Sequence, residues 1–300
     1  MSTTPPTITQ QRGFAIAPRI AAILSFISSC YVIYYILYKE RYRLKRLYHR
    51  LVLGMNIALI MMAFSYIWGT AAVPEGTPYY VGAKGTIDTC TAQGFICVMF
   101  AMVVPIYYAS LVLQSYMGIK NNFQEAKYVW IEKYIHLVAW IFPLVIGIAL
   151  AATDNINPWG AGCWYGKAPR GCETDPSIPC ERGDDIGPFL LIVGFTQISL
   201  YFIFPPAVVI AMYCWIRRVH KKMSSCSGMH QIRQAARKEM LNSIRKQITL
   251  YLLALAFWST FVLGLASNAY KIITEGSMLY NLHLLATSIF AFQGFVFGYT

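Results

Sequence analysis

The stretch KERYRLKRLYHR, residues 39–50, holds six Lys or Arg residues and one His within twelve positions. In a soluble protein such a cluster is typical of a nucleic-acid site or a targeting signal. Here, apolar runs border it on both sides, at residues 18–38 and 51–73. Each run is about 20 residues long, the length with which a helix crosses the hydrocarbon core of a bilayer. The stretch therefore indicates a loop at a membrane surface, and we expect no nucleic-acid partner.

The whole chain alternates between apolar runs and short polar gaps in this way. Its 300 residues are 57% hydrophobic and 13% charged, whereas an average soluble domain has about 25% charged residues. Seven runs are long enough to span a membrane, at about residues 18–38, 51–73, 90–118, 131–152, 188–216, 247–268 and 280–299. Because lipid offers no partner for open backbone groups, each run is expected to be a helix. The predicted fold is an all-α integral membrane protein, a seven-transmembrane helix bundle over residues 18–300 that follows a short extracellular N-terminus, residues 1–17.

Positive charge is concentrated in every second gap. The gaps 39–50, 119–133 and 217–246 hold 18 of the 25 Lys and Arg residues, and nine of the 13 acidic residues lie on the other side. Loops rich in Lys and Arg stay on the cytoplasmic side of a membrane. This pattern predicts a multi-pass protein of the plasma membrane with its N-terminus outside and its C-terminus inside, in contact with membrane lipid.

Four of the eight cysteines, Cys90, Cys163, Cys172 and Cys180, fall on the predicted outer side, where oxidising conditions permit disulfides. Cys90 opens the third span and Cys163 lies in the second outer loop, so a bridge between them would tie that loop over the bundle. Cys172 and Cys180 are close enough in sequence to close a small loop. Four cysteines allow three pairings, and the sequence does not choose between them.

The spans lack the residues that several classes of membrane protein need. No Asp, Glu, Lys or Arg occupies the middle of a run, which argues against a proton pump. Residues 280–300 contain no Lys to form a Schiff base, which argues against a retinal protein. The five His residues lack metal-ligand spacing. We therefore expect no enzyme activity, catalytic residue, metal or cofactor. Prolines are expected to kink or open three spans: Pro105, Pro143, Pro205 and Pro206.

Several short motifs resemble those of a known receptor class. CTAQGF at 90–95 is similar to the entry to span three of cyclic-AMP receptors, and AWIFP at 139–143 is similar to the Trp-x-x-Pro of family-2 span four. GCWYG at 162–166 matches a Cys-Trp in the second outer loop, and FQGFV at 292–296 resembles a Gln-Gly of span seven, here Gln293 and Gly294. With these motifs and seven predicted spans, the chain resembles a G-protein-coupled receptor of the secretin-like (family 2) and cyclic-AMP-receptor-like group. Within that group it is similar to the orphan receptors of microbial eukaryotes, whose ligands are unknown.

The resemblance implies that the chain passes an extracellular signal to a heterotrimeric G protein, with an effect on cyclic AMP as one output. His49 stands where family-2 receptors carry a His near the inner end of span two, but span three lacks the carboxylate expected to pair with it. The end of span three also lacks an Asp/Glu-Arg-Tyr triplet, and with about 17 polar residues before the first span we expect no large Cys-rich N-terminal domain. The unknown ligand is therefore expected to be a small molecule that meets the mouth of the bundle.

Two groups of candidate residues follow. At the outer mouth, ring and amide side chains are candidates for ligand contact: Gln93, Trp164, Tyr165 and Gln197. At the inner end, cations and His49 are candidates for a switch or for G-protein contact: Arg46, His49, Arg50, Arg217, Arg218, Lys221, Lys222, Arg237, Arg245 and Lys246. Each of these residues also has a purely structural or lipid-facing explanation. The alternative function is a small-solute facilitator or a polytopic membrane protein that does not signal.

Overall fold

The computed structural model describes residues 7–121, 123–169, 172, 177–223, 284–285, 287–289 and 291–292. Predicted span six and most of predicted span seven lie outside these residues. So do Arg237, Arg245 and Lys246 and the motif residues Gln293 and Gly294.

Five helical segments of the described chain are long and apolar enough to cross a membrane, and they coincide with the first five predicted spans. Helix α1 is Ile8–Tyr34, α2 is Leu47–Trp68, α3 is Ile87–Lys120 and α4 is Glu132–Ala152. The fifth segment consists of α5, Ile186–Ile198, a π-helical turn at Ser199–Ile203, and α6, Phe204–Met223. The chain is thus a multi-pass membrane protein.

Helix α1 begins well before the expected residue 18, because Thr7 caps it. The Thr7 hydroxyl accepts a hydrogen bond from the Gln10 backbone N–H, and the Gln10 side chain accepts one from the Thr7 N–H. This reciprocal pair satisfies two of the backbone donors that a helix start leaves open. Much of the segment predicted as a polar N-terminus is therefore helical.

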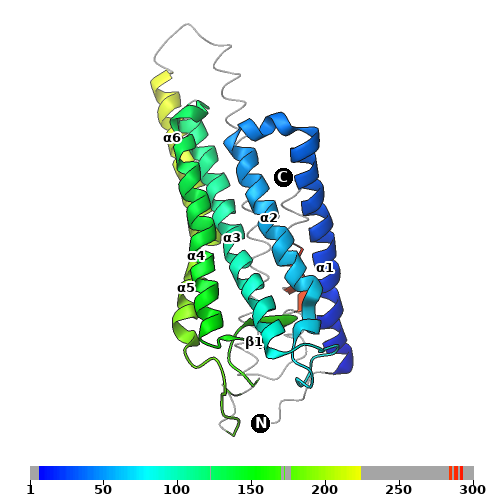
Figure 1. The fold of residues 1–300 in the computed structure, drawn as a ribbon. Helices are drawn as coiled ribbons and strands as arrows, with labels where there is room; N and C mark the ends of the chain where they lie inside the picture. The colour runs from blue at the N-terminus through cyan, green and yellow to red at the C-terminus, as the bar shows by residue number, and fades with distance from the viewer. Residues whose placement is uncertain are drawn as a thin grey trace.

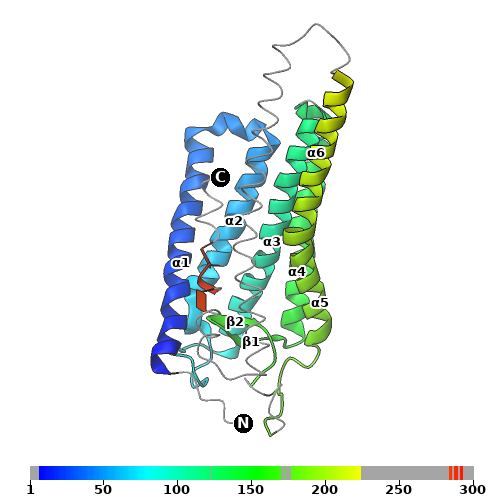
Figure 2. The same ribbon diagram turned by 180° about the vertical axis from the view of Figure 1, so that it is seen from behind.

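The helices run side by side along one long axis, with α1 at the rim of the bundle next to α2 (Figures 1 and 2). Helix α3 is the central element, because 89% of its most apolar stretch is buried, against 33% for the α1 span. It packs on α2, α4 and α6. The side chains shared by these helices include Tyr107, Tyr108 and Tyr201, all fully buried.

The prolines affect the helices differently. Helices α3 and α4 continue through Pro105 and Pro143, whereas the chain opens into a π turn at Ser199–Ile203 just before Pro205 and Pro206. Proline lacks a backbone N–H, and its ring clashes with the carbonyl of the residue four positions earlier. A wider turn at this point relieves that clash.

The end of the bundle at which α3 begins is closed by a two-stranded hairpin of β1, Ile156–Trp159, and β2, Gly162–Tyr165. A disulfide between Cys90 at the start of α3 and Cys163 in β2 holds the hairpin over the bundle. A second disulfide joins Cys172 and Cys180. This is one of the three pairings that the sequence left open.

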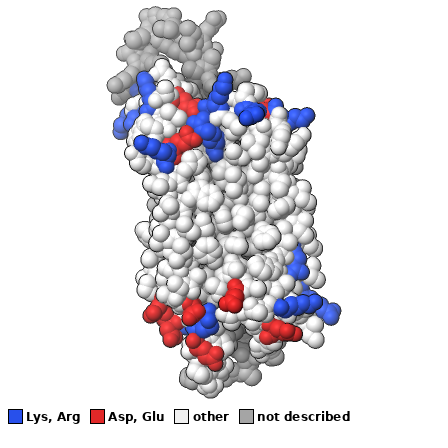
Figure 3. All heavy atoms as spheres, viewed as in Figure 1, with Lys and Arg blue, Asp and Glu red and all other residues white. Residues whose placement is uncertain are grey.

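On the face shown in Figure 3, charged residues gather at the two ends of the described part of the molecule, and a broad uncharged band separates them. At one end lie the hairpin and the start of α3. At the other lie the loop Arg41–Lys45, a 3-10 helix, and the loop between α3 and α4, which contains the short 3-10 segments Glu125–Lys127 and Val129–Ile131. The uncharged band matches the requirement for burial in hydrocarbon.

Candidate functional site

The amide of Gln93 joins three elements at the hairpin end of the bundle. Its Nε2 donates to the backbone oxygens of Ser65 and Gly69, each at 2.8 Å, and its Oε1 accepts from the backbone N–H of Cys163 at 3.0 Å. The side chain is only 2% exposed. Gln93, predicted as a ligand contact, therefore connects α3 to the end of α2 and to β2.

Two glycines make this arrangement possible. Gly69, directly after α2, has a φ of +54°, a value that glycine adopts readily. In this conformation the Gly69 carbonyl faces Gln93. A Cβ on Gly94 would lie 2.2 Å from the Cγ2 of Ile156 in β1. The hairpin therefore rests on α3 at a position that accepts only glycine.

A cavity of about 50 Å³ lies under the hairpin. Its described lining combines neutral polar groups and rings, among them Ser65, Tyr66, Gln93, Trp164 and Thr287. Sites for drug-sized ligands usually measure about 300–1,000 Å³. In this conformation the cavity has room for a very small uncharged molecule, and a larger ligand requires the hairpin or the helices to move.

The other predicted mouth residues have separate places. Trp164 lines the cavity and lies against Tyr165, with ring centroids 5.2 Å apart. Burial raises the pKa of the Tyr165 phenol, so this ring stays uncharged. Gln197 is buried in α5, and its Nε2 has no hydrogen-bond partner among the described residues. The structure thus brings two of the four candidates, Gln93 and Trp164, to the cavity.

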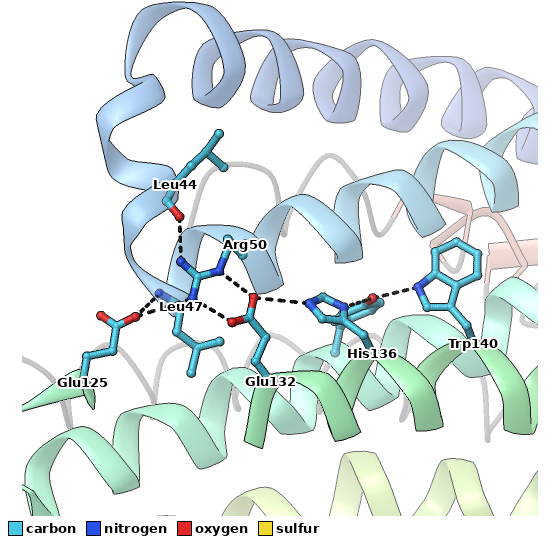
Figure 4. Close-up of polar contacts among 8 residues, drawn as sticks. Leu44, Leu47, Arg50, Glu125, Glu132, His136 and Trp140 are labelled. Atoms are coloured by element: carbon cyan, nitrogen blue, oxygen red, sulfur yellow. Dashed lines mark hydrogen bonds and ion pairs between the residues drawn. The ribbon is translucent and has the colours of Figure 1, made fainter. Parts of the chain in front are cut away.

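At the opposite end, Arg50 of α2 is the centre of an ion-pair network (Figure 4). Its Nε and Nη2 contact the two carboxylate oxygens of Glu132 in α4 at 2.5 and 2.7 Å. Its Nη1 donates to the Leu44 carbonyl at 2.7 Å. A two-point contact of this kind fixes the relative orientation of both side chains.

A second carboxylate reaches the same place from the loop after α3. Glu125 accepts a hydrogen bond from the backbone N–H of Leu47, the first residue of α2, and lies 3.9 Å from Nη2 of Arg50. Helix α2 receives no side-chain cap from its own N-cap residue, Arg46. Glu125 satisfies one of its open donors and places negative charge at the positive end of the helix dipole.

The network continues toward the membrane interior. Glu132 Oε1 lies 3.6 Å from Nε2 of His136, and Nδ1 of His136 lies 2.7 Å from the Tyr107 hydroxyl. Trp140 Nε1 donates to that hydroxyl at 2.9 Å. Because the indole N–H of Trp140 occupies one lone pair of the Tyr107 oxygen, the Tyr107 O–H is available to donate to Nδ1. In the tautomer that accepts this bond, a neutral His136 carries its proton on Nε2, facing Glu132.

Comparison with known proteins gives a structural match without a sequence match. No family model and no curated protein matches the chain. The crystal structure of squid rhodopsin superposes with a TM-score of 0.63 over 97% of this chain and 83% of the rhodopsin chain, at 11% sequence identity. The chain has a rhodopsin-like fold. An identity this low defines the fold and leaves the ligand and the activity open.

Within this rhodopsin-like fold, the predicted inner residues separate into paired and free groups. Arg50 belongs to the network, whereas Arg46 is exposed. His49 lies edge-on to Tyr48, with centroids 5.2 Å apart, and its Nδ1 has no hydrogen-bond partner in the described part of the chain.

On α6, Arg217 and Arg218 are exposed, and Arg217 lies 4.7 Å from the centre of the Tyr213 ring. Lys221 and Lys222 belong to the same helix, but their side chains are outside the described structure.

Sequence reasoning missed five residues of this network: Tyr107, Glu125, Glu132, His136 and Trp140. One available signal was that only four acidic residues, Glu40, Glu125, Glu132 and Glu239, lie in the three basic gaps, and two of these four belong to the network. Among the described residues, no group of three His, Cys, Asp or Glu side chains is placed to hold a metal ion.

Proposed function

We propose that this chain is a G-protein-coupled receptor that senses a small extracellular molecule at the hairpin end and signals to a heterotrimeric G protein at the Arg50 end. The observation that carries the proposal is the rhodopsin-like fold. Two of its helices extend from the cavity to the inner half of the bundle. Helix α2 carries Ser65 and Arg50, and α3 carries Gln93 and Tyr107.

The orientation in this proposal follows from charge. The Arg50 end carries the basic gaps 39–50 and 119–133, so in this proposal it faces the cytoplasm, and the end with the hairpin and the two disulfides faces the oxidising exterior. Assignment to the family-2 and cyclic-AMP-receptor-like group rests on the short motifs at 90–95, 139–143, 162–166 and 292–296.

The mechanism is a shift between two arrangements of the helices. A ligand that fits an enlarged cavity binds better when the hairpin and Gln93 have moved, so it favours that arrangement. Because Gln93 holds α2 to α3, this movement changes the relative position of the two helices. Arg50, Glu132 and Tyr107 then lose or rearrange their contacts, and the two inner loops become free to accept the G protein.

The cavity indicates the ligand class. Its described lining offers amide, hydroxyl and aromatic groups without an ionised side chain. Such a lining binds a neutral molecule with one or two hydrogen-bonding groups and an apolar face. We therefore propose a small uncharged metabolite as the ligand.

The test is expression in cells that carry a G-protein dissociation reporter, followed by exposure to a panel of neutral metabolites, with cyclic AMP as a second readout. We expect one compound class to activate the reporter. Trp164→Ala should weaken that response while leaving the amount of protein at the cell surface unchanged. Uptake of labelled solutes without any G-protein response would contradict the receptor function and favour a facilitator.

A further inference from the structure

One face of α1 changes chemistry along its length. The exposed side chains of α1 are aliphatic at Ile16, Ile20, Ile23 and Ile27 and aromatic at Tyr31 and Tyr34. The π-helical turn Tyr35–Lys39 and the loop that follow α1 continue this series with Tyr35 and Tyr38 and then with the cations Lys39 and Arg41. This is the order in which side chains pass from the hydrocarbon core through the interface to the headgroups. Because α1 lies at the rim of the bundle (Figures 1 and 2), this face is open to lipid.

Four tyrosines form two stacked pairs next to the cations. Tyr31 stacks on Tyr35 and Tyr34 stacks on Tyr38, with centroids 6.2 and 5.3 Å apart. Tyr38 is 75% exposed, and Tyr42 in the following loop is 66% exposed. Their hydroxyl groups provide hydrogen bonds at the level where a lipid phosphate would lie.

Of the six cations in residues 39–50, two form ion pairs and four form none among the described residues. Arg43 forms an ion pair with Glu40, and Arg50 is held by Glu132. Four other cations are exposed and form no ion pair within the described residues: Lys39, Arg41, Lys45 and Arg46. Four unneutralised charges thus lie within eight consecutive residues.

We infer that the four free cations, together with Tyr38 and Tyr42, form a binding surface for anionic membrane lipid, with a polyphosphorylated inositol headgroup as the best fit. Clusters of four or more cations directly beyond a membrane span attract anionic and phosphoinositide lipids. A headgroup with several phosphates can contact more of the four charges at once than a headgroup with one. This surface does not depend on the proposed receptor activity.

The location favours lipid over a protein partner. The cations continue the lipid-exposed face of α1 at the rim, whereas the network of Arg50 and Glu132 lies between α2 and α4. Tyr38 and Tyr42 are amphipathic rings of the type that settles at the interface. A partner bound only through the cations would leave this aromatic surface without a function.

The experiment counts bound lipids on the full-length protein, purified in detergent, by native mass spectrometry during titration with phosphatidylinositol bisphosphate or phosphatidylcholine. The variant carries Arg41→Gln and Lys45→Gln. The matched control carries Arg12→Gln and Lys84→Gln, which removes two exposed cations from the opposite end. We expect the variant to bind the phosphoinositide on the order of twenty-fold more weakly, while the control binds as the parent does.

Three further measurements sharpen the result. Tyr38→Ser with Tyr42→Ser should also weaken binding, and the soluble inositol trisphosphate headgroup should compete poorly because it lacks acyl chains. Raising salt from about 0.1 M to about 1 M shortens the Debye length from about 10 Å to about 3 Å, so the parent protein should release the lipid. Equal affinity of the loop variant and the parent, equal losses in variant and control, or full competition by the soluble headgroup would overturn the inference.

Discussion

Arg50 and Glu132 are 82 positions apart in sequence, yet they form a two-point ion pair between α2 and α4. Both side chains are largely shielded, with 28% and 20% of their surface exposed. The guanidinium also holds the Leu44 carbonyl of the preceding loop. The pair thus joins a loop and two helices at the end of the bundle where we propose that a G protein binds.

The first prediction concerns this pair. Arg50→Gln or Glu132→Gln should each lower the free energy of unfolding by about 1–3 kcal/mol, because each leaves the other charge partly buried without its partner. The double variant should lose less than the sum of the two, and thermal denaturation in detergent measures all three. Lys45→Gln is the control, since this exposed side chain forms no ion pair among the described residues. Strictly additive losses would show that the two residues do not interact.

A second prediction follows from Gly54. A Cβ at this position would lie 2.6 Å from the Cζ of Tyr107, so Gly54→Ala should force Tyr107 away from His136 and Trp140. The expected cost in unfolding free energy is about 1–3 kcal/mol, typical of overpacking. Gly194→Ala is the matched control, because an added Cβ there meets no atom within 4 Å. An equal effect of both substitutions would contradict the close contact of α2 with Tyr107.

The third prediction separates two buried amides. Gln93→Leu removes three hydrogen bonds and leaves two carbonyls and one N–H without this partner, so it should destabilise the protein by several kcal/mol, at about 1–3 kcal/mol per unsatisfied group.

Gln197→Leu is its matched control, since Gln197 is equally buried but its Nε2 makes no hydrogen bond to the described residues. It should leave the melting temperature nearly unchanged. A lower response to the activating ligand in that variant would identify Gln197 as a ligand contact.

The fourth prediction compares the two disulfides. Cys90 and Cys163 are separated by 73 positions and Cys172 and Cys180 by 8. In the chain-entropy model the longer loop contributes about 4 kcal/mol and the shorter about 2.5 kcal/mol. Cys90→Ser with Cys163→Ser should therefore lower the melting temperature more than Cys172→Ser with Cys180→Ser. A larger loss from the second pair would show that strain or residual structure outweighs loop entropy.

The sequence predicted the first five spans well because length and apolarity alone determine which segments enter a bilayer. It placed the start of α1 too late, because hydropathy does not register a cap such as Thr7. It also suggested a ligand-binding role for Gln93, whose three partners come from α2 and β2 and are invisible in a linear pattern. A buried amide has the same sequence signature whether it binds a ligand or a backbone.

The network around Arg50 was harder to predict for a similar reason. The cluster at residues 39–50 makes the cations the prominent feature of the sequence, and span three offers no carboxylate to pair with His49. The structure places the acidic residues at Glu125 and Glu132, after α3, and pairs them with Leu47 and Arg50 instead. Which cation pairs with which carboxylate depends on the orientation and packing of the helices in the bundle. Amino-acid composition contains no information on either.

The contact between Glu125 and Leu47 has a consequence for biosynthesis. Because the carboxylate that caps α2 comes 78 residues after the N–H it accepts, the first turn of α2 is made before its cap exists. At about 5–20 residues per second, the ribosome needs about 4–16 s to reach Glu125. During that interval the start of α2 relies on water or on lipid headgroups, and it acquires its final partner only when α3 has been inserted and the chain has turned back toward α4.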